Sequence, residues 1–173
     1  MQPTHEIEAS YCTPDPWQYQ NDPRDLVRKE KIIETAKRFS PFPLPYRNAL
    51  DIGAGEGWIT KDFPATIKHG YELSQQARDR FPENVIAIGE PVGSYELITA
   101  TGVMYDHYNW PWFMHLIDEH ASNIVITCNI KTWEIPALRD ERVIKDMRLS
   151  EIFTEEFEYR EFIQKLRVFK RIG

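Results

Sequence analysis

The segment 49–58 carries the clearest chemical signal of the chain, a short apolar run that ends in Gly-x-Gly-x-Gly. Asp51 stands near the end of the run, and open α/β sheets bind ligands in the crevice beyond their strand ends. Gly53 permits a tight turn, because glycine adopts positive φ readily. Gly55 lets the backbone approach a ligand, and Gly57 is expected to open a helix whose amides face a polar group. The spacing therefore predicts a ligand-binding loop.

The same spacing argues against a dinucleotide site. Such a site needs its third glycine three positions after the second, where this chain has Trp58. Glu72 ends the next apolar run, about twenty residues beyond Asp51, and a carboxylate there can accept two hydrogen bonds from ribose hydroxyls. The plainer alternative for Glu72 is a helix-capping role beside Ser74. We take the ribose role as the prediction because of its distance from the glycine loop.

The glycine loop resembles motif I of the class I S-adenosylmethionine-dependent methyltransferases. Other segments resemble the nodulation-protein-S-like branch of these enzymes, namely Asp15-Pro16-Trp17, Asn21-Asp22-Pro23, Arg28-Lys29, Tyr95-Glu96-Leu97-Ile98 and Gly102-Val103-Met104-Tyr105. The resemblance covers about residues 15–130, and the terminal hairpin also fits that fold. It implies S-adenosyl-L-methionine as cofactor and methyl transfer as activity.

The resemblance also implies which residues bind the cofactor. The glycine loop would cradle the methionine part, Glu72 would hold the ribose, and Leu73 would pack on the adenine. Residues after the third strand would meet the adenine edge, although many family members carry an acid and an amide there. Residues after the fourth strand would line the reacting end. The full set is Arg28, Asp51, Gly53, Ala54, Gly55, Gly57, Glu72, Leu73, Gly89, Glu90, Thr101 and Gly102.

Residues 101–112 form the most aromatic stretch of the chain and are expected to line the reacting end. Methyl transfer from a sulfonium needs an aligned nucleophile and the exclusion of water, and aromatic faces tolerate the cation. An amine nucleophile must lose a proton, which His107 or Asp106 can accept. Tyr105 is suited to orienting the acceptor. We therefore predict Tyr105 and His107 as catalytic residues, with core packing as the alternative.

The N-terminal region is predicted to form a lid. Trp17 and Tyr19 would cover the cofactor, and Arg28 would reach its carboxylate through a charge-assisted bond. The alternative is that Arg28 and Lys29 belong to a solvated helix face. Trp133 and Glu134, which follow the fifth strand in sequence, would form a wall of the acceptor pocket.

Composition limits the classes of function. The 173 residues include 21 basic and 27 acidic side chains, and the formal net charge is −6. The acidic balance argues against a protein that coats nucleic acid. No apolar run is long enough to span a bilayer, and no signal peptide is recognisable at the N-terminus. Two distant cysteines fit a reducing cytoplasm, and the spacing of the histidines predicts no metal site.

The elements that must position these residues follow from hydrophobic patterning. Short apolar runs alternate with helical stretches, which predicts an α/β fold. We expect a Rossmann-like, mostly parallel seven-stranded sheet with helices on both faces and a C-terminal antiparallel hairpin. The expected division is an N-terminal extension and lid helix over 1–45 and a cofactor-binding core over 46–173, one domain in all. The helices predicted are 23–39, 74–81, 112–120 and 136–149; no helix fits between 88 and 97, and the hairpin strands are 153–162 and 165–172.

Three functions remain open at this stage. The first is a methyltransferase for a small-molecule or saccharide amine or hydroxyl acceptor, because the length leaves no room for a separate substrate domain. The second is a methyltransferase for RNA or protein. Its only support is a basic cluster formed by Arg24, Arg28, Lys29, Lys31, Lys37 and Arg38. The third is a non-catalytic binding module on the same fold. The sequence does not reveal the oligomeric state.

Overall fold

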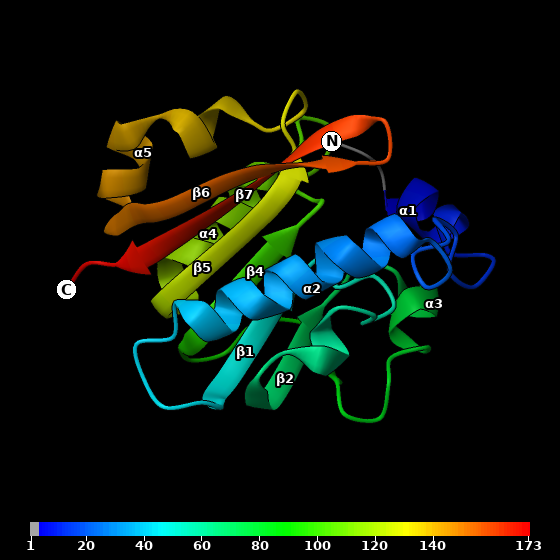
Figure 1. Cartoon of the computed structure of the whole chain (residues 1–173). Coiled ribbons are helices and arrows are strands. Elements are labelled where there is room, and N and C mark those ends of the chain that lie inside the picture. Colours follow the sequence, from blue (N-terminus) through cyan, green and yellow to red (C-terminus); the bar gives the residue numbers. More distant parts are fainter. Residues whose placement is uncertain (1–3) are drawn as a thin grey trace.

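Seven strands form one mixed sheet in the order β3-β2-β1-β4-β5-β7-β6 (Figure 1). The computed structural model describes residues 4–173. Strand β7 runs antiparallel to both of its neighbours, and the pairs from β3 to β5 are parallel. The strands are β1 (Tyr46–Ile52), β2 (Ala65–Tyr71), β3 (Ile86–Ile88), β4 (Tyr95–Thr101), β5 (Ala121–Ile130), β6 (Leu149–Tyr159) and β7 (Phe162–Arg171). The predicted seven-stranded sheet with a C-terminal antiparallel hairpin is confirmed.

Helices cover both faces of the sheet, as predicted. On one face, α2 (Pro23–Arg38) buries Ile32 and Ala36 against β1, β4, β5 and β7. On the other face, α4 (Trp110–His120) buries Leu116 and Ile117 against the same strands, and α5 (Glu141–Asp146) adds Ile144. Figure 1 shows α2 crossing the near face and α4 behind the sheet. The two apolar layers hold the carboxyl ends of β1, β2 and β4 at one common edge.

Helix α2 begins where its sequence predicts. Asp22 caps α2, because its Oδ1 accepts a hydrogen bond from the backbone N of Arg24 at 2.9 Å. Pro23 occupies the first helical position, where its missing N–H is not needed. The predicted absence of a helix between β3 and β4 is also confirmed.

The helix expected to open at Gly57 does not form. A single turn closes there, with the N of Lys61 donating to the O of Gly57 at 3.0 Å, and the 3-10 segment η1 (Thr60–Asp62) follows. The reason is local, because Pro64 disfavours helical backbone at the preceding residue and β2 begins at Ala65. The glycine loop therefore returns almost directly to the sheet.

Several other boundaries differ from the predictions. The N-terminal extension contains a helix that was not predicted, α1 (Thr4–Ser10). The helix 74–81 shortens to α3 (Gln75–Arg78), still capped by Ser74. The stretch 136–149 divides into η2 (Pro136–Arg139) and α5, because extended Asp140 ends the first and caps the second. The hairpin turns at Arg160, which has φ 53, rather than near Ile163.

Candidate functional site

The glycine loop lies at the carboxyl edge of the sheet and is tied to the neighbouring strand. The backbone N atoms of Gly53 and Ala54 donate to the carbonyl of Tyr71 at 2.8 and 3.2 Å. Gly53 has φ +71, and a Cβ there would lie 2.3 Å from Cγ1 of Val103. Glycine is therefore required at this position both for backbone conformation and for space.

Glu72 contacts the loop directly. Its Oε2 accepts a hydrogen bond from the backbone N of Gly55 at 2.9 Å, and its Oε1 accepts one from the N of Ser74 at 3.0 Å. The side chain is 7% exposed, and burial raises the pKa of the carboxyl group. The structure thus brings together the loop and the acid that the sequence placed apart. The alternative role of Glu72, capping beside Ser74, is also partly realised, because the backbone N of Ser74 donates to its carboxylate.

Asp51 is enclosed beneath the loop instead of opening onto the crevice. Its Oδ1 accepts from the hydroxyl of Thr99 and its Oδ2 from the hydroxyl of Thr60, both at 2.6 Å. Burial raises the pKa of Asp51 to about 6, and the two hydroxyl hydrogen bonds oppose that rise. Asp51, which belongs to β1, therefore links this strand to β4 and to η1 inside the core.

Arg28 extends from α2 to the same edge of the sheet. The residue is 4% exposed, which excludes the solvated-face alternative for it. A Cβ on Gly102 would lie 3.2 Å from its Nη2, so Arg28 sits against the loop after β4. Among residues 4–173, its Nε has no hydrogen-bond partner, and its ion pair with Asp25 spans 4.0 Å. A buried guanidinium with this little neutralisation is suited to an anionic ligand.

Residues 11–21, here named the N-terminal strap, cover the glycine loop. A Cβ on Gly55 would lie 3.1 Å from the hydroxyl oxygen of Tyr11. The rings of Trp17 and Tyr19 are stacked at 5.9 Å, and Tyr19 is stacked on Trp58 at 6.4 Å. The strap thus places the aromatic rings of Trp17 and Tyr19 over the glycine loop.

Charged groups fasten the strap to the core. The carboxylate of Glu56, inside the glycine loop, accepts from the backbone N of Asp15 at 3.0 and 3.1 Å. Arg80 donates to Glu56 Oε1 at 2.7 Å and to the carbonyl of Tyr11 at 2.9 Å. Glu56 therefore links the loop to the strap, a role that the sequence did not suggest.

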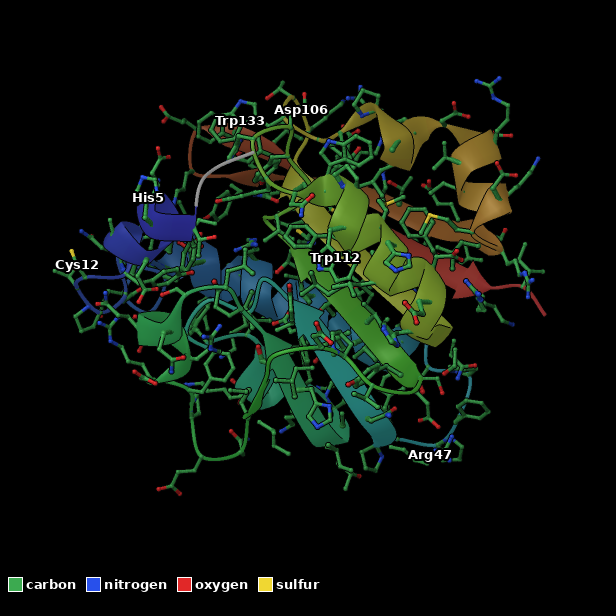
Figure 2. All side chains as sticks on the ribbon, turned by 180° about the vertical axis from the view of Figure 1, so that it is seen from behind. His5, Cys12, Arg47, Asp106, Trp112 and Trp133 are labelled. Atoms are coloured by element: carbon green, nitrogen blue, oxygen red, sulfur yellow. The ribbon has the colours of Figure 1, made fainter. Side chains whose placement is uncertain are left out.

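The predicted catalytic residues lie in the segment between β4 and α4. Tyr105 is 7% exposed, and its hydroxyl accepts from the backbone N of Ile130 at 3.0 Å. His107 is exposed, and its ring is stacked on Tyr105 with centroids 5.6 Å apart. Trp133 meets Tyr105 edge-on at 5.9 Å. In Figure 2, Asp106 and Trp133 lie at one end of the sheet and Arg47 at the other.

Glu134, expected to wall the acceptor pocket, is instead a buried ion-pair partner. Its carboxylate is bound by Arg167 of β7 through Nε at 3.1 Å and Nη2 at 3.0 Å, and the residue is 2% exposed. Its backbone pairs with Tyr105 in an isolated bridge. Trp133, 48% exposed, is the member of this pair that faces outward.

The remaining predicted residues are less closely associated with the loop. Leu73 follows Glu72 and is 36% exposed. Thr101 ends β4 and is half-buried. Gly89 and Glu90 follow β3 and are exposed, and no hydrogen bond of residues 4–173 joins them to the loop.

Other residues complete the site without having been predicted. Tyr108 is near Glu72 and Tyr19, and burial raises its pKa to about 12. Thr99 pairs in register with Asp51 across β4 and β1. A hydroxyl on a neighbouring strand is a recognisable signal only when the register is known, and the sequence did not supply the register.

No family model and no curated protein matches the sequence. Solved structures do match, and together with the strand order they define the fold as that of the class I S-adenosylmethionine-dependent methyltransferases. The resemblance noted in the sequence is therefore confirmed for the fold.

Three similar structures show the range of these matches. The N-methyltransferase NodS from Bradyrhizobium japonicum WM9, in complex with S-adenosyl-L-homocysteine, has TM-score 0.75 and 14% identity, with 98% of each chain covered. Magnesium protoporphyrin IX methyltransferase ChlM from Synechocystis PCC 6803, with bound SAM, has TM-score 0.72 and 11% identity, covering 99% of this chain and 98% of its own. A complex of the Haloferax volcanii Trm112 activator with a putative methyltransferase gives TM-score 0.63 and 13% identity, covering 97% of this chain and 98% of that chain.

Two kinds of feature are absent from residues 4–173. None of the helices is both long and apolar enough for a bilayer crossing. No three or more His, Cys, Asp or Glu side chains between residues 4 and 173 lie together as metal ligands would.

Proposed function

We propose that the protein is an S-adenosylmethionine-dependent methyltransferase. The observation that carries the proposal is the hydrogen bond between Glu72 Oε2 and the N of Gly55, which unites the acid and the glycine loop at one strand edge. The likeness to NodS and ChlM supports it, because those proteins were solved with S-adenosyl-L-homocysteine and SAM.

The residues present fit the cofactor. The unpartnered Nε of buried Arg28 can donate to its carboxylate. Glu72 can accept from the ribose hydroxyls, and Leu73 offers apolar surface to the adenine. Asp51 supports the glycine loop from the protein interior, through its hydrogen bonds with Thr60 and Thr99. When bound, the cofactor supplies an electrophilic methyl group.

The acceptor side is assigned to the aromatic residues after β4. Tyr105 and Trp133 would enclose the acceptor and exclude water, which favours transfer to the acceptor over hydrolysis. Exposed His107 would take the proton of an amine or hydroxyl nucleophile. The acceptor proposed is a small molecule or a saccharide bearing an amine or hydroxyl group.

The structure weakens the main support for an RNA acceptor. Of the basic cluster, Arg28 and Lys29 are buried. Arg24 pairs with Asp22 at 2.7 Å and Lys31 with Glu155 at 2.5 Å. Pairing and burial leave little free positive charge to contact a phosphate backbone.

Calorimetric titration with S-adenosyl-L-homocysteine tests the proposal. We expect saturable one-site binding to the wild-type chain, and loss of affinity in Arg28→Gln. Absence of binding to the folded wild type would overturn the cofactor assignment. Transfer of a radiolabelled methyl group to glucosamine tests the acceptor class, and full turnover by His107→Ala would remove His107 as the base.

A further inference from the structure

Asp25, in the first turn of α2, joins three parts of the chain that are distant in sequence. The residue is fully buried. Its Oδ1 accepts from the hydroxyl of Tyr159 at 2.5 Å, and its Oδ2 accepts from Nη2 of Arg160 at 2.6 Å. Arg28 approaches the same carboxylate at 4.0 Å. The tip of the β6–β7 hairpin is therefore bound to the start of the lid helix.

Arg160 also holds the N-terminal strap. The same Nη2 atom that contacts Asp25 donates to the carbonyl of Trp17 at 3.0 Å. Arg160 has φ 53, a left-handed conformation, and lies in the turn between β6 and β7. One side chain thus connects the hairpin, the lid helix and the strap.

Two tyrosine rings extend this connection to Arg28. The guanidinium carbon of Arg28 lies 5.8 Å from the ring centroid of Tyr19 and 5.6 Å from that of Tyr159. The corresponding distances for Arg160 are 5.9 and 5.5 Å. Because both cations share both rings, Tyr19 of the strap cannot leave without removing favourable contacts from each.

We propose that Arg160 is a positioning residue that latches the strap over Arg28 and thereby strengthens binding of the cofactor carboxylate. The ligand named here rests on the proposed function. Arg160 acts in two ways: it neutralises Asp25, which would otherwise compete for Arg28, and it keeps the strap closed. A closed strap excludes water and strengthens the ion pair between Arg28 and a carboxylate.

The test compares Arg160→Gln and Arg160→Lys with a matched control, Arg142→Gln. Arg142 is an exposed arginine that contacts Asp140 at the start of α5 and has no hydrogen bond to Trp17, Asp22 or Asp25. Strap opening is measured by hydrogen exchange in the free protein at the amide of Asp15, which donates to the carboxylate of Glu56 in the glycine loop. Affinity for S-adenosyl-L-homocysteine is measured by calorimetry.

In Arg160→Gln, we expect the Asp15 amide to exchange about tenfold faster and S-adenosyl-L-homocysteine to bind about tenfold more weakly, because a charged hydrogen bond is lost. Arg160→Lys keeps the positive charge but not the simultaneous contact with Asp25 and Trp17. Its exchange rate and its affinity should therefore lie between those of wild type and Arg160→Gln. Arg142→Gln should stay within about twofold of wild type in both measurements.

Wild-type exchange or wild-type affinity in Arg160→Gln would overturn the latch. If Arg160→Gln does not fold, the smaller change in Arg160→Lys decides the question by the same two measurements. Failure of the wild-type chain to bind S-adenosyl-L-homocysteine would instead overturn the proposed function, and with it the ligand half of the latch. The exchange measurement would still decide whether Arg160 holds the strap.

Discussion

The carboxylate of Glu72 and the backbone amide of Gly55 are in direct contact, 2.9 Å from Oε2 to N. Glu72 follows β2, and Gly55 lies in the loop after β1. These two strands are neighbours in a parallel sheet, so their carboxyl ends meet at one edge. The contact makes Glu72 both a support for the loop and a group placed to bind the same ligand.

Replacing Glu72 should separate these two roles. In Glu72→Gln an acceptor for the Gly55 amide remains, so we expect a folded chain with about tenfold weaker binding of S-adenosyl-L-homocysteine, from loss of the charged acceptor. Glu72→Ala also releases the loop and should lose about a hundredfold. Calorimetry measures both, with exposed Glu83→Gln as control. Wild-type affinity in Glu72→Ala would remove Glu72 from the binding site.

Two glycines with similar backbone angles distinguish strain from crowding. Gly93 has φ +75 with no atom within 4 Å of an added Cβ, so Gly93→Ala should cost only the conformational penalty, about 1 kcal/mol. Gly53→Ala adds a clash with Val103, and we expect several times that loss, roughly 3 kcal/mol or more. Urea unfolding of both variants measures the difference. Equal losses would show that the loop relaxes away from Val103.

Asp51 should make stability depend on pH in a recognisable direction. Its folded pKa, about 6, lies well above the usual value of an aspartate, so the folded chain binds the proton more tightly than the unfolded chain. The contribution of Asp51 to stability therefore falls as pH rises from about 4 to about 6. Asp51→Asn removes this titration.

We expect the stability of Asp51→Asn relative to wild type to increase over that pH range, by up to about 3 kcal/mol. The measurement is urea unfolding at pH 4, 5, 6 and 7, with exposed Asp79→Asn as control. A difference between Asp51→Asn and wild type that does not change with pH would contradict the raised pKa.

Among the charged contacts on the acceptor side, the ion pair of Glu134 and Arg167 should contribute most to the stability of the fold. Both partners are at least 95% buried, and Arg167 holds the carboxylate through two nitrogens. Glu134→Ala leaves the guanidinium with one carboxylate partner, Glu151, which binds its Nη1 at 2.7 Å, and we expect a loss of about 2–3 kcal/mol in unfolding free energy.

The control for this pair is Glu156→Gln, which breaks an exposed contact with Lys131 and should change the melting temperature little. Similar melting temperatures for Glu134→Ala and Glu156→Gln would show that the pair at Glu134 adds nothing beyond a surface contact.

Much of the fold could be read from local patterns. The apolar runs predicted all seven strands, and Asp22 with Pro23 predicted the start of α2. These features depend on a few adjacent residues, which is why local chemistry is sufficient for them. The missing helix after Gly57 was not predicted, although Pro64 and the closeness of β2 account for it.

The sequence by itself determined the sheet, the glycine loop and the acid at Glu72, because each depends on residue type and short spacing. Only the tertiary structure decided which groups face one another. It enclosed Asp51 between Thr60 and Thr99, buried Glu134 against Arg167, and brought Arg160 to Asp25 across 135 residues. Such contacts depend on strand register and on how the helices cross the sheet. Both are set by packing of the whole core, so no short segment of the sequence contains them.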